Sequence, residues 1–406
     1  MDARVETRGR RSAGGPFAWI GRRILARIDR GIAAGAIAVS LPGDMPRRLG
    51  GRAPGPEAIV ILHSWRSLWR LAAGGSAGWY EAWTAGEWES PDPVALFELF
   101  TLNRHTLAPT ARAQGIGRWA RRMWHRARRN DRAGARRNIV EHYDLGNEFY
   151  ELWLDPSMTY SSAMFAAPGQ SLEDAQRTKL RAILDRTGCG PGDRILEIGC
   201  GWGSFAETAA RAGASVHGIT LSSEQKAYAE ARLARQGLAG EIVLTDYRDV
   251  SGTFDGVASI EMVEAVGVEY WRDYLDAIAR SLNPGGRAAI QYIAIDDAIF
   301  DDYARNVDFI QRYVFPGGML LSESRFRAIA GQVGLSWRDR QAFGFDYAET
   351  LRRWREAFDA VVATGRLPTR FDRQFVGLWR YYLMYCEGGF RGGAIDVAQV
   401  TLVKEG

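Results

Sequence analysis

The chain has 406 residues, of which 46% are hydrophobic and 25% are charged. A chain of this size can bury a full core, and its length suits two or three domains. Its apolar runs are too short to cross a bilayer, and the N-terminus lacks the apolar core of a signal peptide. Three widely separated cysteines form neither a metal spacing nor a disulfide framework. We therefore expect a globular protein of the cytoplasm with no metal site.

The net charge of +4 hides an uneven distribution of charge along the chain. Residues 1–137 contain 24 Arg and 11 acidic residues, which gives +13. The remaining residues contain 28 basic and 37 acidic residues, which gives −9. A basic N-terminal half favours an acidic partner such as an anionic membrane or a nucleic acid, although it can also serve only to keep the chain soluble.

The N-terminal half divides into a tail and a domain. Residues 1–15 are rich in Arg, Gly and Ser, which predicts a disordered basic tail. Residues 16–111 predict a small α+β domain with helices at 19–34 and 93–104 and strands at 36–41 and 58–62. Aromatic residues between positions 79 and 88 favour core packing, but an apolar ligand groove uses the same residue types.

Residues 112–137, here called the basic segment, contain ten Arg and one acidic residue, Asp131. On a helix, several of these Arg would share one surface, with Trp119 and Trp124 near its edge. Such a surface suits an anionic membrane, where each basic residue near the headgroups adds about 1 kcal/mol. Nucleic acid would attract the same charge, and a solvated linker helix is a third interpretation.

Strand and helix patterns alternate from residue 138 to residue 406, which predicts a parallel sheet with helical crossovers. The helices include 222–236, opened by a Ser cap, and 270–282, closed by the turn residues 283–286. The expected strands are 194–198, 215–220, 241–244, 254–260, 287–293, 335–341 and 395–403. Seven strands with the last pair returning antiparallel would form a doubly wound, Rossmann-like methyltransferase sheet of the α/β class.

The turn after the first of these strands carries the most informative motif. Glu197 ends the strand, and three alternate glycines follow it, Gly199, Gly201 and Gly203. Glycines allow the turn and let the backbone approach a nucleotide without a Cβ in the way. A nicotinamide fold would instead show G-x-G-x-x-G and an acid after the second strand. The motif therefore predicts a binding site for S-adenosylmethionine (SAM).

Other candidate residues follow the third and fourth strands, where ligands of open α/β sheets bind. Asp246 can accept the adenine amino group while Tyr247 packs on the ring, although an Asp that caps a helix is the alternative. Glu261 and Glu264 lie in an apolar run, where a buried carboxylate is costly unless it is paired or functional. Aromatic residues from 292 to 347 suit either a core or an apolar tunnel with π faces near a cation.

The chain from about 138 to 403 resembles the catalytic domain of cyclopropane fatty acyl phospholipid synthases and the related mycolic acid cyclopropane and methyl transferases. The motifs that carry the resemblance are residues 138–150, 154–163, 197–203, 220–225, 246–249, 315–318, 343–347 and 379–391. The resemblance implies a SAM-dependent methyltransferase that acts on unsaturated acyl chains of membrane phospholipids.

The N-terminal half is similar in outline to that of the longer, phospholipid-acting members of this family. This similarity implies a lipid-recognition domain at 16–111, a membrane-facing linker at 112–137 and a catalytic domain at 138–406. It places the protein peripherally at the inner face of the membrane. The implied partner is an unsaturated phospholipid at an anionic membrane surface. A homodimer would add a second copy of the chain as a partner. No nucleic acid is expected to bind.

The resemblance also implies roles for single residues. SAM contacts are assigned to Tyr160, Ser161, Glu197, Gly199, Gly201, Gly203, Thr220, Gln225, Asp246 and Tyr247. Cys386 matches a cysteine that is commonly regarded as active. A double bond attacks the SAM methyl group, and a bicarbonate ion then removes a proton from the carbocation. The bicarbonate ligands correspond to Ser162, Glu264, Gln291, Ile293 and Tyr347.

Three positions depart from the family pattern. Ser162 stands where the family usually has Cys, Gln291 where it usually has His, and Ala265 replaces another usual His. Gln can hold an anion but cannot relay a proton as His does. Proton loss from the transferred methyl gives a cyclopropane, whereas loss from a neighbouring chain carbon gives a methyl-branched unsaturated chain. The changed ligands favour the branched product slightly, and both products stay open.

Two other classes of methyltransferase also stay open. An enzyme for a soluble small molecule would have the same fold but would not need the basic segment. A nucleic-acid methyltransferase would use the basic half, yet it normally needs a polar pocket that reads a base.

Overall fold

The computed structural model describes residues 16–111 and 145–405. Contacts divide the chain into two compact units, residues 1–117 and 118–406. The tail at 1–15, the basic segment and the family motif at 138–144 lie outside the described residues, so the predictions made for them stay predictions.

The first unit is a four-stranded sheet with helices, as the predicted α+β class requires. Its elements are α1 (Pro16–Gly31), β1 (Ala36–Ser40), β2 (Arg47–Gly50), β3 (Glu57–Leu62), α2 (Arg66–Thr84), β4 (Trp88–Glu89), α3 (Pro93–Leu102) and α4 (Arg104–Ala111). The strand order is β2-β1-β3-β4, with β1 parallel to β3 and the outer pairs antiparallel. Helix α2 and the two outer strands were not predicted.

The predicted helix at 93–104 is interrupted at Asn103. The Asn103 side-chain amide donates to the carbonyls of Leu99 and Ala34, both at 2.8 Å. Its oxygen accepts from the backbone N–H groups of Ala33 and Ala34. A polar side chain that bonds to nearby backbone in this way competes with the helix ladder and ends α3.

The aromatic residues of this unit form a core and not a groove. Trp79 and Trp88 are buried and stacked, with ring centroids 4.3 Å apart. The Trp88 indole N–H donates to the Trp79 carbonyl at 2.9 Å. The core-packing interpretation of this motif is therefore correct.

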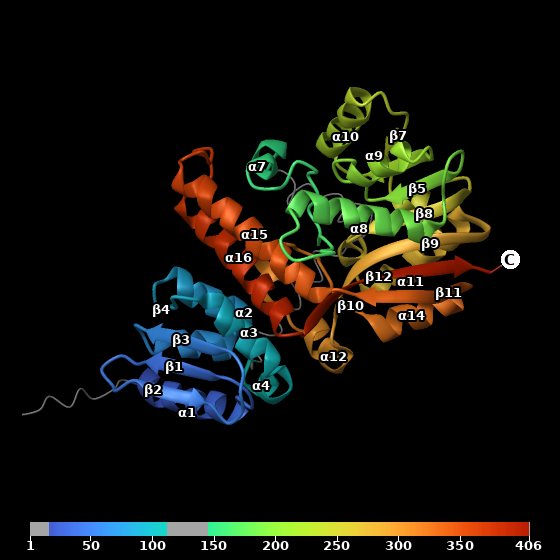
Figure 1. The fold of residues 1–406 in the computed structure, drawn as a ribbon. Coiled ribbons are helices and arrows are strands. Elements are labelled where there is room, and N and C mark those ends of the chain that lie inside the picture. The colour runs from blue at the N-terminus through green and yellow to red at the C-terminus, as the bar shows by residue number, and fades with distance from the viewer. Residues whose placement is uncertain (1–15, 112–144, 406) are drawn as a thin grey trace, which may run out of the picture. The chain divides into compact units, whose positions relative to one another are not determined.

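The second unit contains the predicted seven-stranded sheet (Figure 1). Its strands are β5 (Arg194–Ile198), β6 (Ser215–Thr220), β7 (Glu241–Leu244), β8 (Phe254–Ile260), β9 (Leu282–Ile295), β11 (Leu335–Ala342) and β12 (Ile395–Lys404), and β10 (Leu321–Ser322) adds a short pairing to β9. The order is β11-β12-β9-β8-β5-β6-β7. Strand β12 runs antiparallel to both neighbours, and the other pairs along the path are parallel.

The sheet is buried on both faces, as its continuous apolar strands predict. On one face, α8 (Leu172–Thr187), α9 (Ser204–Arg211) and α10 (Ser223–Arg235) share a core with Ile195. On the other face, α11 (Trp271–Ser281) and α14 (Glu323–Gln332) share a core with Leu196. The turn expected at 283–286 is already part of β9, which begins at Leu282, directly after α11.

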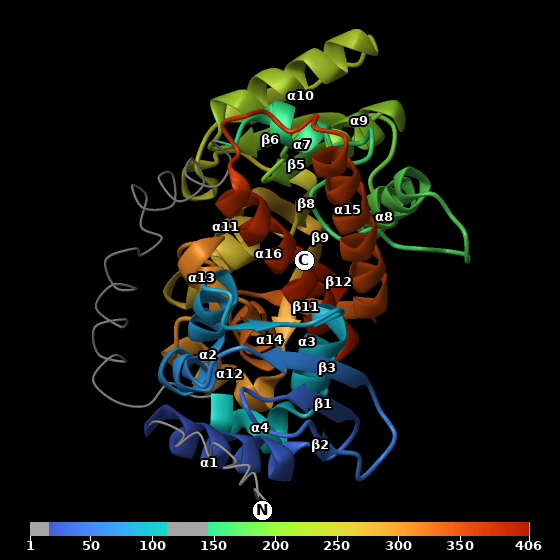
Figure 2. The same ribbon diagram turned by 90° about the vertical axis from the view of Figure 1, so that its left-hand side faces the viewer.

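The remaining elements precede the sheet or lie in the connections between its strands. They are α7 (Asn147–Glu151), α12 (Asp297–Arg305), α13 (Phe309–Tyr313), α15 (Gly344–Ala363), α16 (Arg373–Arg391) and the 3-10 turns η1 (Tyr247–Asp249), η2 (Val263–Ala265) and η3 (Val268–Tyr270). Helices α15 and α16 follow β11 and precede β12 in the sequence, and they pack side by side (Figure 2). The fully buried Glu387 of α16 joins them through an ion pair to Arg355 of α15, and it also pairs with Arg391 of its own helix. No described helix is both long and apolar enough to cross a membrane.

Candidate active site

A cavity lies at the carboxyl ends of β5, β6 and β8. In the strand order, β5 lies between β6 and β8, so the order of the strands reverses direction at β5. Ligands of doubly wound sheets bind at such a switch point. The lining includes the predicted residues Tyr160, Ser161, Glu197, Gly199, Gly201, Thr220, Gln225 and Tyr247. The structure thus brings eight of the ten predicted cofactor residues to one cavity.

The three glycines of the motif serve different purposes. A Cβ on Gly199 would lie 2.8 Å from Met262, and one on Gly203 would lie 2.8 Å from Ala229, so these two glycines permit close packing within the protein. A Cβ on Gly201 would meet nothing within 4 Å, although its φ of +50° favours glycine. Gly201 is therefore the position where the backbone faces open space in the cavity.

Asp246 is not among the residues that line the cavity. Its carboxylate accepts from the Arg248 side chain at 2.8 and 2.6 Å. It also accepts from the Arg248 backbone N–H, so Asp246 caps the N-terminus of η1. This is the capping arrangement that the sequence left as the alternative. Tyr247, its neighbour, does line the cavity.

Glu197 presents a free acceptor to this cavity. Its side chain is 3% exposed, and its Oε2 has no hydrogen-bond partner among the described residues. Burial raises the pKa of this carboxyl to about 8. Buried polar atoms are normally paired, so this oxygen suits a ligand that brings hydroxyl groups.

A second carboxylate, Glu261, collects three donors from three separate parts of the chain. Its Oε1 accepts from the Ser162 backbone N–H at 2.9 Å and from the Gln291 side-chain amide at 2.8 Å. Its Oε2 accepts from the Tyr347 hydroxyl at 2.7 Å. Glu261 also lines the cavity at the strand ends, so it joins that cavity to the predicted catalytic residues.

The hydrogen-bond network fixes the orientation of the Gln291 side chain. Gln399 lies opposite Gln291 in the pairing of β12 with β9, and its amide donates to the Gln291 oxygen at 3.0 Å. The Gln399 oxygen in turn accepts from Arg186 at 3.1 Å. Because the Gln291 oxygen is occupied, its amide hydrogens point to Glu261 and to the Ser162 carbonyl.

Glu264 and Ile293 form a separate pair beside this group. The Ile293 N–H donates to Glu264 Oε1, while Oε2 is buried without a partner among the described residues. Burial, and then the nearby Glu261, raise the pKa of Glu264 to about 8. Two neighbouring carboxyl groups in a buried place disfavour a double negative charge.

Lys179 supplies the positive charge of the site and was not predicted. It is fully buried on α8, and its Nζ donates to Ser161 Oγ at 2.6 Å. Burial lowers its pKa to about 8, against the attraction of Glu261, Asp155 and Glu197. In sequence, a Lys on an amphipathic helix has the signature of a solvent-exposed residue, so no local signal marks this one.

Burial also raises the pKa of Glu261, and Lys179 is the largest opposing cause. In the sequence, Glu261 lies in the apolar run where a buried carboxylate is costly, but neither the motifs nor the resemblance predicted a role for it. Its φ of +49° lies in the left-handed region, which is rare for a residue with a side chain. Strained backbone of this kind clusters at functional sites, and the sequence gives no sign of it.

Cys386 lies on α16 and is partly exposed. Desolvation raises the pKa of the Cys386 thiol well above its usual range. A reactive cysteine needs a thiolate, which a raised pKa disfavours. The active role expected for Cys386 stays a prediction.

Aromatic rings pack around Tyr160, which lines the cavity, and around Tyr347. Tyr160 packs on Trp354 with ring centroids 5.3 Å apart, and its hydroxyl bonds to that of Tyr382 at 2.9 Å. Tyr347 packs against Phe390 at 4.4 Å. Of the aromatic residues predicted to form a tunnel, Tyr347 lies here, whereas Tyr292 belongs to the sheet core and Phe345 is 76% exposed.

The fold and this glycine-lined cavity define a SAM-dependent methyltransferase. The chain matches the family model of mycolic acid cyclopropane synthetase over residues 130–400, and it belongs to that family. It is 39% identical over 353 residues to the tuberculostearic acid methyltransferase UfaA1 of Mycobacterium tuberculosis, which covers 83% of this chain and 81% of the relative.

Two further comparisons agree with this assignment. The chain is 37% identical over 266 residues to the cyclopropane-fatty-acyl-phospholipid synthase of Escherichia coli, covering 65% of this chain and 67% of that protein. The solved structure of mycolic acid cyclopropane synthase CmaA1 complexed with SAH and CTAB matches with a TM-score of 0.63 and 29% identity, over 66% of this chain and 98% of that one.

Proposed function

We propose that this enzyme methylates the cis double bond of an unsaturated acyl chain in a membrane phospholipid and that the main product is methyl-branched. The observation that carries the proposal is the position of Glu261, a partly buried carboxylate that lines the SAM cavity and is hydrogen-bonded on both oxygens. A reaction through a carbocation needs both a base and a nonpolar, aromatic environment at this place.

The proposed reaction is a methyl transfer followed by the loss of a proton. The π electrons of the double bond attack the SAM methyl carbon, the carbon–sulfur bond breaks, and S-adenosylhomocysteine leaves with that electron pair. The adjacent chain carbon is then a cation, which the faces of rings such as Tyr160 and Trp354 can stabilise. Loss of a proton leaves an electron pair that closes either a ring or a new double bond.

The names of several relatives support a lipid substrate. They include the Escherichia coli synthase compared above, a probable fatty acid methyltransferase of Pseudomonas putida and two fungal sphingolipid C9-methyltransferases. The branched product is supported by the similarity to UfaA1, which extends over 83% of this chain. It is also supported by Ser162 and Gln291, which replace the usual Cys and His.

Lipid analysis of a bacterium that expresses the protein tests this proposal. We expect phospholipid acyl chains that gain one methylene unit in mass, and gas chromatography to separate a branched alkene from a cyclopropane of the same mass. Only cyclopropane would overturn the branched product. Methylation of a soluble metabolite with unchanged lipids would overturn the substrate class.

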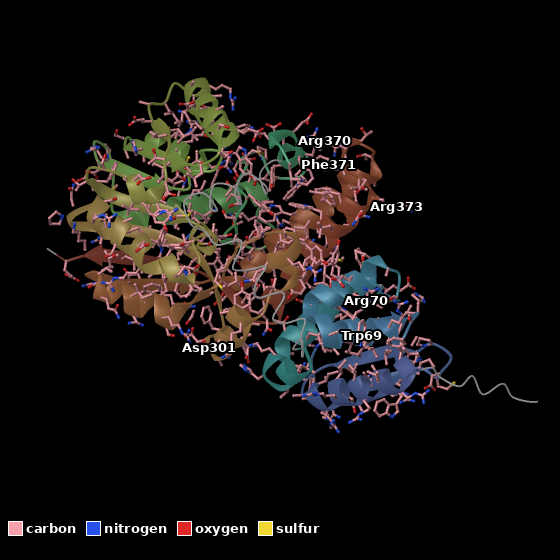
Figure 3. The ribbon with its side chains drawn as sticks, turned by 180° about the vertical axis from the view of Figure 1, so that it is seen from behind. Trp69, Arg70, Asp301, Arg370, Phe371 and Arg373 are labelled. Carbon is pink, nitrogen blue, oxygen red and sulfur yellow. The ribbon has the colours of Figure 1, made fainter. Side chains whose placement is uncertain are left out.

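A surface on the first unit supports contact with an anionic membrane. Phe17, Trp19 and Trp69 are 40%, 62% and 46% exposed, and Phe17 packs edge-on against Trp69 with ring centroids 6.2 Å apart. Arg23 stacks on Trp19 and Arg22 stacks on Trp65. Figure 3 shows Trp69 on α2 next to Arg70. We call Phe17, Trp19, Arg22, Arg23, Trp65 and Trp69 the aromatic–arginine patch.

We expect the aromatic–arginine patch and the basic segment to hold the enzyme at the inner face of the membrane. Aromatic rings settle at the headgroup level while Arg meets anionic lipid, so binding should weaken as salt screens the charge. Replacing Trp19 and Trp69 with Ser should weaken binding to anionic vesicles about 10-fold or more, because Ser does not bury the apolar area that each indole ring would bury in the membrane. Sedimentation with vesicles measures this effect.

The matched control replaces Met45, which is 77% exposed but lies outside the patch, with Ser. This variant should bind vesicles as the parent does. Equal binding by the double variant and the control would show that the patch does not meet the membrane.

A further inference from the structure

We propose that Glu261 is the base of this enzyme and that its carboxylate takes the place of the bicarbonate ion implied by the family resemblance. The inference rests on the proposed function, because only a reaction through a carbocation needs a proton acceptor here. Glu261 would then be a catalytic residue, and Gln291 and Tyr347 would position it.

The donors expected to hold bicarbonate are already occupied by protein groups. The single hydrogens of the Ser162 N–H and the Tyr347 hydroxyl go to Glu261, and the two amide hydrogens of Gln291 go to Glu261 and the Ser162 carbonyl. The Ser162 hydroxyl donates to the Ala163 carbonyl, and the Ile293 N–H donates to Glu264. A separate anion would have to displace these bonds, so the residues present do not fit bicarbonate.

The backbone at Glu261 shows how a side chain can occupy this place. Its φ of +49° is one that glycine adopts freely, and its N–H is anchored to the Gln291 carbonyl at 2.8 Å. A glycine here would leave the three donors around an empty space of carboxylate size. The Glu side chain fills that space with an anion that is covalently attached to the protein.

The surroundings suit a base that takes one proton per turnover. Glu261 lines the SAM cavity, so its carboxylate borders the space where the methyl group is transferred. The carboxylate oxygen would accept the proton of the carbocation, and the electrons of that C–H bond would close the ring or the double bond. The proton would leave to water after product release, and Lys179 would favour this step because it opposes the effect of burial on the pKa of the carboxylate.

The experiment compares wild type, Glu261→Gln and Glu261→Gly on vesicles of unsaturated phosphatidylglycerol, in carbon-dioxide-free buffer and with added bicarbonate. We expect equal wild-type turnover in both buffers. Glu261→Gln should bind SAM normally but lose about 10²-fold or more in turnover. Glu261→Gly should be equally slow without bicarbonate and should recover when bicarbonate fills the space. Exposed Glu269, changed to Gln, is the matched control and should turn over normally.

A wild-type enzyme that needs bicarbonate, or a Glu261→Gln enzyme that keeps its turnover, would overturn the inference. A folding defect in the variants would appear as lost SAM affinity by calorimetry. A separate arm uses no lipid: ¹³C-labelled bicarbonate observed by NMR should bind to Glu261→Gly and not to wild type. If wild type transfers no methyl group to lipid, the proposed function fails, and this binding arm still decides whether Glu261 replaces the anion.

Discussion

Replacing Lys179 with Met should destabilise the protein by about 3–5 kcal/mol, because removing one partner leaves buried charges uncompensated. Lys179 is fully buried and is attracted to Glu261, Asp155 and Glu197, so its loss affects both carboxylates of the cavity. Met keeps most of the volume of Lys, so the change removes charge and not packing. Denaturant unfolding measures the expected loss.

The same substitution should change the pH dependence of turnover. Lys179 is the largest cause that lowers the pKa of Glu261, while burial raises it. Without Lys179 the pKa of Glu261 rises further, the carboxylate is protonated at higher pH, and the base is lost there. The acid limb of the pH profile should therefore move to higher pH.

Lys226→Met is the matched control for the loss of a Lys. Lys226 forms a partly exposed ion pair with Glu230 on α10, and such pairs contribute about 0–1 kcal/mol. If Lys179→Met were as stable as this control and kept the wild-type pH profile, Lys179 would not be the counter-charge of the site.

Replacing Gly201 with Val should remove most SAM binding while the fold persists. The new side chain would project into open space of the cavity, where no protein atom lies within 4 Å. Filling space that a ligand needs costs about 1–3 kcal/mol or more, which corresponds to about 10- to 100-fold in affinity. Calorimetric titration with SAM measures this loss.

Backbone strain accompanies any side chain at Gly201, so the control must share it. Gly237 has a φ of +64° and open space around it, and it does not line the cavity. Gly237→Val should therefore lose similar stability but bind SAM normally. Equal SAM affinity in folded Gly201→Val would contradict the assignment of the cavity.

Much of the second unit could be predicted from sequence because its signals are local. The strands β5 to β8 are apolar runs bounded by turn residues, and their predicted limits are those observed. The glycine motif is local too, since Gly199, Gly201 and Gly203 all have the positive φ that this turn requires. Helix α2 was missed because its glycines and tryptophans do not form a helical pattern, and its Gly75 has non-helical angles.

The centre of the site could not be predicted, because it depends on residues far apart in the chain. Glu261 acquires its role from Ser162, Gln291 and Tyr347, which lie on a loop, on β9 and on α15. The resemblance identified these three residues but assigned them to a free anion. The left-handed backbone at Glu261 and the burial of Lys179 also have no signature in the sequence.

We infer that this methyltransferase acts on lipid double bonds with a base built into its own chain. The most direct measurement uses SAM labelled with ¹³C in its methyl group, vesicles of unsaturated phospholipid, and buffer freed of carbon dioxide. We expect the labelled carbon to enter the acyl chains at an unchanged rate and to give NMR signals outside a three-membered ring. Unlabelled lipid would contradict the lipid substrate, and labelling that begins only when bicarbonate is added would contradict a base built into the chain.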